Sequence, residues 1–152
     1  VVDITHLDMS GVDKDQLYYA LVPMKSEDSK IFYPVDSDKV VMRSVVTKDQ
    51  AKDLVSEIKD IEPMRIENDR QREAKYKEAL VSCDCKQLIC IIKTMYARNK
   101  ERIAKGKRIT YVDDRYLKEA KQNLNDEFSI ALGIEPREVE KYIKAQIVEQ
   151  EA

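Results

Sequence analysis

The sequence predicts an α+β protein in which a small antiparallel β module, residues 1–46, precedes an all-α helical bundle, residues 47–152. Runs of β-branched and aromatic residues, separated by turn-forming clusters, occupy the first segment. From Thr47 onward, apolar residues instead recur at the spacing of one face of a helix. A chain of 152 residues can form two such modules, since a domain can be as short as about 50 residues.

Three runs of β-branched and aromatic residues predict strands of the β module, and a fourth, shorter run predicts one more. The first three are residues 1–4, 17–22 and 31–35, and the shorter run is 40–42. Together they predict a small antiparallel sheet or open barrel with little core. Because the chain opens without Met inside the first run, we expect the first strands of the module to lie before Val1.

Capping residues mark the ends of the predicted helices. Thr47 and Gln50 fit a capping box for a helix that Pro63 closes, and Asp84 can cap the helix whose apolar stripe ends at Tyr96. Between them, a mostly polar helix is predicted at about 67–81. The remaining signals are Thr110 or Asp113 near the start of a helix at about 112–132, Gly133 after it, and Pro136 in the first turn of the last helix.

The overall charge excludes one familiar class of nucleic-acid binder. Lys and Arg number 27 against 29 Asp and Glu, a net charge of -2, whereas basic nucleic-acid-binding domains have a pI above about 9. Any contact with DNA must therefore be local. No apolar run approaches the roughly 20 residues of a membrane span, so we expect no membrane partner.

The cysteines and histidine argue against a metal site, a cofactor or an enzyme. Cys83, Cys85 and Cys90 form an odd, closely spaced set, which predicts free thiols in a reducing cytoplasm. Their spacing lacks the usual two-residue gap of a zinc site, and the one histidine, His6, lies in the other module. Cys90 falls on the apolar stripe and is predicted to be a small core residue. No nucleophile–base pair can be assembled, so we expect no catalysis and no small-molecule substrate.

Several ordered segments resemble the CarD/CdnL family of bacterial transcription regulators. In the helical part they are SCDCKQLICIIKTMY at 82–96, the Lys105-Gly106-Lys107 turn, DRYL at 114–117 and ALGI at 131–134. In the β module they are IFYPV at 31–35 and MRSVV at 42–46. The resemblance covers nearly the whole chain, and it depends on the order of the segments rather than on one motif.

The resemblance implies a Tudor-like RNA-polymerase-interaction domain, related to that of transcription-repair coupling factor, followed by a DNA-contacting helical domain. Such a protein binds the polymerase β subunit, contacts promoter DNA near the upstream edge of the bubble and stabilises the open complex. Two departures matter. The chain has no Trp, and Asn68 to Arg72 occupies the region where many relatives place a Trp wedge and an Arg pair. Phe32 stands where some relatives place a polymerase-contacting Arg.

Two basic groups are the candidates for largely sequence-independent contact with DNA phosphates. The same residues have two alternative roles. They can form a solvent-exposed helix face with intrahelical ion pairs, or they can complement the negative end of a helix dipole. The candidates are Arg70, Arg72 and Lys75 in the first group, beside Lys77, and Arg98, Lys100, Arg102, Lys105, Lys107 and Arg108 in the second.

Aromatic and β-branched residues of the strands are the candidates for polymerase binding. They are Tyr18, Tyr19, Ile31, Phe32 and Tyr33. Sheet core is the alternative role, but alternation along a strand should turn one of each aromatic pair outward. A protein-only adaptor, in which the bundle binds a second protein instead of DNA, is the rival function, and the absent Trp and the acid-rich last helix favour it.

Overall fold

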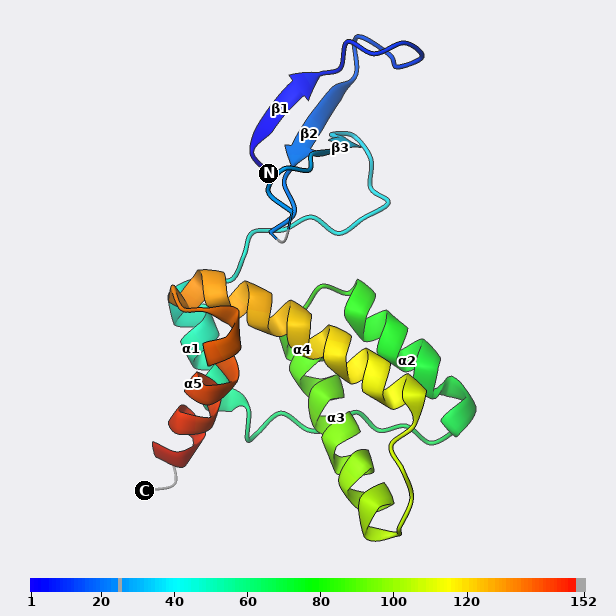
Figure 1. Ribbon diagram of the computed structural model, residues 1–152, viewed down its shortest axis with the longest axis vertical. Coiled ribbons are helices and arrows are strands. Elements are labelled where there is room, and N and C mark those ends of the chain that lie inside the picture. The colour runs from blue at the N-terminus through cyan, green and yellow to red at the C-terminus, as the bar shows by residue number, and fades with distance from the viewer. Residues whose placement is uncertain (25, 150–152) are drawn as a thin grey trace. The chain divides into compact units, whose positions relative to one another are not determined.

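The computed structural model, which describes residues 1–24 and 26–149, has three strands followed by five helices (Figure 1). This arrangement confirms the predicted α+β class, with its small antiparallel sheet first. The chain divides into two compact units, Val1–Met42 and Arg43–Ala152, which we call the β unit and the helical unit. The division falls a few residues before 46/47, because Arg43 and Val46 form hydrogen bonds within the helical unit.

The β unit is a three-stranded antiparallel sheet in the order β1-β2-β3. Its strands are β1 (Asp3–His6), β2 (Leu17–Leu21) and β3 (Ile31–Pro34). The prediction of a fourth strand at residues 40–42 is wrong, since these residues form no strand. Their three side chains are all exposed, so the short run gains no packing that would hold it against the sheet.

The register separates the two faces of this sheet. Ile4 lies opposite Tyr19, which lies opposite Tyr33, so these three share a face. Alternation adds further members to that face, and we call the set Ile4, Leu17, Tyr19, Leu21, Ile31 and Tyr33 the apolar sheet face. Ala20, on the opposite face, is the one buried residue among those described in the β unit. The sheet thus has almost no core of its own.

The helical unit contains α1 (Lys48–Glu57), α2 (Asp69–Val81), α3 (Cys85–Ala104), α4 (Tyr111–Leu132) and α5 (Pro136–Glu149). The predicted capping signals are confirmed. Thr47 and Gln50 form a reciprocal capping box, and the Asp84 side chain caps α3. Thr110, rather than Asp113, caps α4, and Gly133 ends it in the left-handed conformation that glycine adopts without strain.

A single core joins the five helices. α3 packs against α2 and α4, while α1 and α5 pack against each other and against α4. The largest fully buried side chains include Tyr76 of α2, Ile91 and Met95 of α3, and Phe128 of α4. Cys90, predicted as a core residue, is only partly buried at the edge of this core, where its thiol donates to the Glu62 carbonyl. Among the described residues, no helix is long and apolar enough to cross a membrane.

Candidate nucleic-acid interface

A buried carboxylate organises the region where the two predicted basic groups meet. Asp113, in the first turn of α4, is 1% exposed. It accepts hydrogen bonds from Arg98 Nε at 2.9 Å and from the Tyr76 hydroxyl at 3.2 Å. These contacts bring α2 and α3 to the N-terminus of α4, where the helix dipole also favours a negative charge.

Two of the predicted DNA-binding arginines belong to this buried network. Arg72 donates to Asp69 at 2.7 Å and to the Tyr76 hydroxyl at 3.3 Å, while Arg98 donates to Asp69 at 3.2 Å. The hydrogen bond from Arg72, and then the charge of Arg98, lower the pKa of Asp69. The Arg72 and Arg98 side chains are only 15% and 20% exposed. Both guanidinium groups thus have carboxylate partners within the helical unit, although the Asp69 side chain is itself 70% exposed.

The same network places Arg70 beside the C-terminal half of α3, and the end of α3 and the turn after it carry the remaining cations. Because Asp69 binds Arg98, the first turn of α2, which carries Arg70, lies beside the C-terminal half of α3. We call the resulting surface the basic tip, and its members are Arg70, Lys100, Arg102, Lys105, Lys107 and Arg108. Lys75 is elsewhere, since it lines a hollow with Met64 and Glu78.

The cations of the basic tip differ in whether their side chains already have a hydrogen-bond or ion-pair partner. Lys105 pairs with Glu101, and Arg102 Nε donates to the Arg108 carbonyl at 2.9 Å. Four of the side chains are exposed and make no hydrogen bond or ion pair with any residue that the structure describes. They are Arg70, Lys100, Lys107 and Arg108. An anion that reached this surface would find donors that need not abandon a partner.

Sequence reasoning missed three exposed hydrophobic residues at the basic tip. Ile103 and Ile109 are exposed, and Tyr111, the first residue of α4, is 79% exposed. The signal was available, because these residues interrupt a basic stretch where helical periodicity offers no core position. Exposed apolar side chains among cations are typical of a binding surface.

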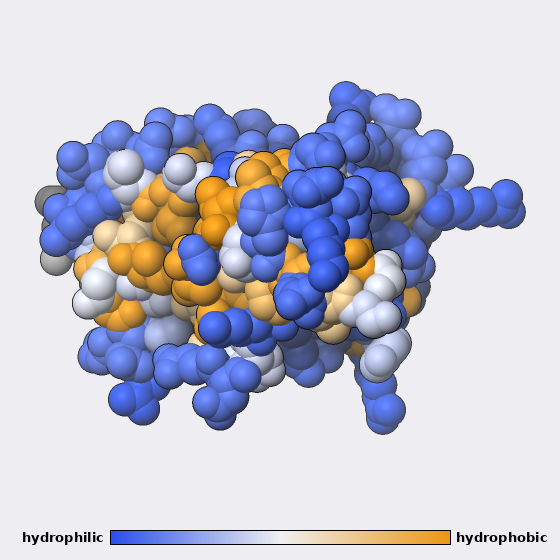
Figure 2. Space-filling model, turned by 90° about the horizontal axis from the view of Figure 1, so that it is seen from above, coloured by the Kyte–Doolittle hydropathy of each residue, from blue (hydrophilic) through white to orange (hydrophobic). Residues whose placement is uncertain are grey.

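The candidate polymerase-binding residues are divided between the two faces of the sheet. Ile31, Tyr33 and Tyr19 belong to the apolar sheet face, while Phe32 and Tyr18 lie on the face that carries Ala20. Ile31 is 52% exposed and Phe32 is 38% exposed, whereas the three tyrosines are half-buried. Figure 2 shows hydrophobic side chains open to solvent on the face that it presents. β1 and β3 are the edge strands of the sheet.

A second polar cluster, which the sequence did not reveal, fixes the start of the helical unit. Arg43 donates to both carboxylate oxygens of Glu127, at 2.5 and 2.8 Å, and to the Cys83 carbonyl. Cys85 donates its thiol hydrogen to Glu127 at 3.1 Å. Burial, followed by this hydrogen bond, raises the pKa of the Cys85 thiol to about 12. A thiol in this state is a poor nucleophile or metal ligand.

The described residues contain no cluster of three or more side chains that could hold a metal ion. Cys83 adopts a φ of 53°, a left-handed conformation that is uncommon for residues other than glycine, at the turn between α2 and α3. No protein-family model matches the chain, and no curated protein matches it significantly.

Proposed function

We propose that this protein is a bacterial transcription regulator that docks on the RNA polymerase β subunit through its β unit and contacts promoter DNA through the basic tip. The observation that carries the proposal is the short stretch at the end of α3 and in the turn after it, where Lys100, Lys107 and Arg108 are exposed and make no hydrogen bond or ion pair with the described residues. The resemblance of the sequence to CarD/CdnL regulators supports the same assignment. No catalysis is part of this function.

The basic tip suits phosphate contact rather than base recognition. Lysine ammonium groups and arginine guanidinium groups position a protein on DNA without reading its sequence. Because the net charge is -2, binding to free duplex should be weak, near the non-specific range of about 10⁻⁴–10⁻⁶ M. Docking of the β unit on polymerase would raise the effective concentration of the basic tip at the upstream fork, so a weak contact could still stabilise the open complex.

The β unit suits protein docking because its sheet leaves hydrophobic side chains exposed. Exposed apolar patches of this kind mark interaction sites, and an edge strand can accept a further strand from a partner. Ile4 and Ile31 of the apolar sheet face are each more than half exposed, at 53% and 52%. We infer that polymerase covers part of this unit.

Charge removal at the basic tip tests the DNA contact. The variant Lys100→Ala/Lys107→Ala/Arg108→Ala should shorten the lifetime of the promoter open complex while leaving polymerase binding unchanged. The matched control removes the same charges from exposed positions elsewhere in the helical unit, as Lys52→Ala/Arg137→Ala/Lys141→Ala. An unchanged lifetime in the first variant, or an equal loss in both, would refute phosphate contact by the basic tip.

The protein-only adaptor is the second candidate function. It is favoured by the internal pairing of Arg72 and Arg98 and by the exposed Ile103, Ile109 and Tyr111, which suit a protein surface as well. The dependence of binding affinity on salt concentration distinguishes the two functions. Contact with phosphates makes log affinity fall with log salt by about 0.9 per phosphate, whereas a mainly apolar interface responds weakly.

A further inference from the structure

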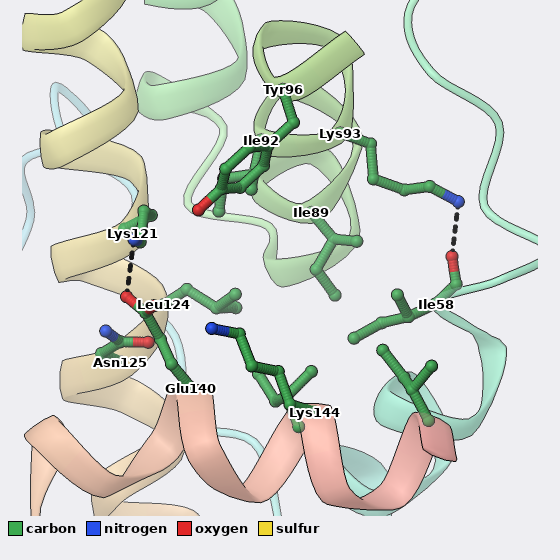
Figure 3. A pocket seen from close by; sticks show the side chains of 12 residues that line it. Ile58, Ile89, Ile92, Lys93, Tyr96, Lys121, Leu124, Asn125, Glu140 and Lys144 are labelled. Atoms are coloured by element: carbon green, nitrogen blue, oxygen red, sulfur yellow. Dashed lines mark hydrogen bonds and ion pairs between the residues drawn. The ribbon is translucent and has the colours of Figure 1, made fainter. Parts of the chain in front are cut away.

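The helical unit contains a pocket of about 250 Å³ that none of the proposed DNA or polymerase contacts uses (Figure 3). It lies where the C-terminal end of α1 meets α3, α4 and α5. Its lining is mostly aliphatic. The aliphatic members are Ile58, Ile89, Ile92, Leu124, Ile143 and Ile147.

The volume and the lining together set the class of molecule that fits. An apolar cavity of roughly 150 Å³ stays dry and binds benzene. A pocket of about 250 Å³ therefore has room for an aryl ring with a short arm or for an alkyl chain of about six to eight carbons. Small-molecule sites typically combine such apolar walls with a few polar groups that fix the ligand's orientation.

The polar rim of the pocket carries more positive than negative charge. Lys121 pairs with Glu140 at 2.7 Å and lies 5.9 Å from the centre of the Tyr96 ring. Lys93 donates to the carbonyls of Ile58 and Ile61, at 2.6 and 2.5 Å, and so completes the end of α1. Both amines are therefore already occupied.

Lys144 is the rim cation that no hydrogen bond holds, although its charge adds to the hydrogen bond from Lys121 in lowering the pKa of Glu140. Its amine makes no hydrogen bond with the described residues, and Figure 3 shows its side chain reaching from α5 over the aliphatic lining. With Lys121 neutralising Glu140, the charges of Lys93 and Lys144 leave the rim positive. The pocket thus pairs an apolar interior with an ammonium group at its mouth that makes no hydrogen bond with the described residues.

We propose that this pocket binds a small amphipathic carboxylate, an aliphatic or aryl acid of about six to eight carbons. Its apolar body lies among the isoleucines and Leu124, and its carboxylate accepts a hydrogen bond from Lys144. Because the pocket walls come from four helices, an occupied pocket would also stabilise the helical unit against unfolding.

Paired probes that differ in their head group test the proposal on the full chain. Octanoate and 1-octanol share the alkyl body, so both should shift the amide NMR signals of pocket residues, with octanoate binding more tightly. Lys144→Met keeps the length of the side chain but removes its charge, and should weaken octanoate binding by up to about fivefold while sparing octanol. Lys141→Met, on an exposed position of the same helix, should change neither affinity.

A second variant tests the apolar part of the pocket. Ile143→Phe should fill the space and reduce binding of both probes. If that variant fails to fold, as judged by circular dichroism, the Lys144→Met comparison decides. The proposal is overturned if octanoate leaves the pocket signals unshifted, if octanol binds as tightly as octanoate, or if Lys141→Met weakens octanoate as much as Lys144→Met does.

Discussion

The two units of this protein bury their hydrophobic residues to very different degrees. The helical unit has a continuous core that includes Tyr76, Ile91, Met95 and Phe128, each essentially inaccessible to solvent. Among its described residues, the β unit buries Ala20 alone and leaves much of its apolar sheet face exposed. The helical unit therefore supplies its own stability, whereas the β unit leaves hydrophobic surface of the kind that marks interaction sites.

The contrast predicts that core substitutions will have large effects in one unit and small ones in the other. Phe128→Ala should lower the free energy of unfolding of the helical unit by about 3–5 kcal/mol, because it leaves a cavity where a fully buried ring had been. Ile31→Ala, at an exposed strand position, should change stability by less than about 0.5 kcal/mol. Denaturant titration of both variants would measure the two losses, and similar losses would contradict the difference between the units.

The buried network under the basic tip should contribute a smaller but still large part of the helical unit's stability. Asp113→Ala leaves Arg98 without its buried partner, and we expect a loss of about 2–3 kcal/mol, less than for a fully buried pair because Arg98 is 20% exposed. Asp114→Ala removes only an (i, i+4) pair with Lys118 and should cost about 0.5 kcal/mol or less. Equal losses in thermal melts would contradict a structural role for the network.

The Glu127 cluster should make the helical unit sensitive to acid. Burial opposes ionisation of Glu127, but hydrogen bonds from Arg43, the Val46 amide and Cys85 outweigh it and lower its pKa below the ordinary 4.5. The stability that this carboxylate adds is therefore present above pH 4.5 and is lost as pH falls through the lower folded value. Glu127→Gln should lower the melting temperature at pH 7 and flatten its decline as the pH falls below 4.5, and an unchanged slope would contradict this.

The reactivity of the cysteine thiols tests whether the hydrogen bond between Cys85 and Glu127 is maintained in the folded protein. Cys85 is buried, and its pKa is raised to about 12, so few molecules carry its thiolate at pH 8. Cys83 is partly exposed at the turn before α3. Iodoacetamide at pH 8 should therefore modify Cys83 before Cys85 in the native protein, as peptide mass spectrometry would show. Faster modification of Cys85 would mean that its bond to Glu127 is not maintained.

Local signals in the sequence were sufficient for most of the fold. Caps such as Thr47, Asp84 and Gly133 act through neighbouring backbone groups, so short patterns identified the helix ends. The strand predicted at residues 40–42 failed because strand formation depends on a partner and on packing, which three apolar residues do not specify.

The candidate site was less predictable because its chemistry depends on distant partners. Arg72 reaches Asp69 and Tyr76 within α2 itself. The bonds that join those two residues to Arg98 and Asp113 form only when α2 packs against α3 and α4. Likewise, Arg43 and Glu127 are separated by 84 positions, and no local pattern connects them. The sequence identified the basic groups, and the structure separated paired from unpaired cations within them.

Binding of the full chain to the RNA polymerase β subunit in the absence of DNA tests the division of labour most directly. We predict that Ile4→Ser combined with Ile31→Ser weakens this binding at least tenfold, because it makes the apolar sheet face polar at two exposed positions. Lys107→Ala combined with Arg108→Ala should leave it unchanged. Loss of β-subunit binding on substitution at the basic tip, with no effect of the substitutions on the apolar sheet face, would contradict docking through the β unit.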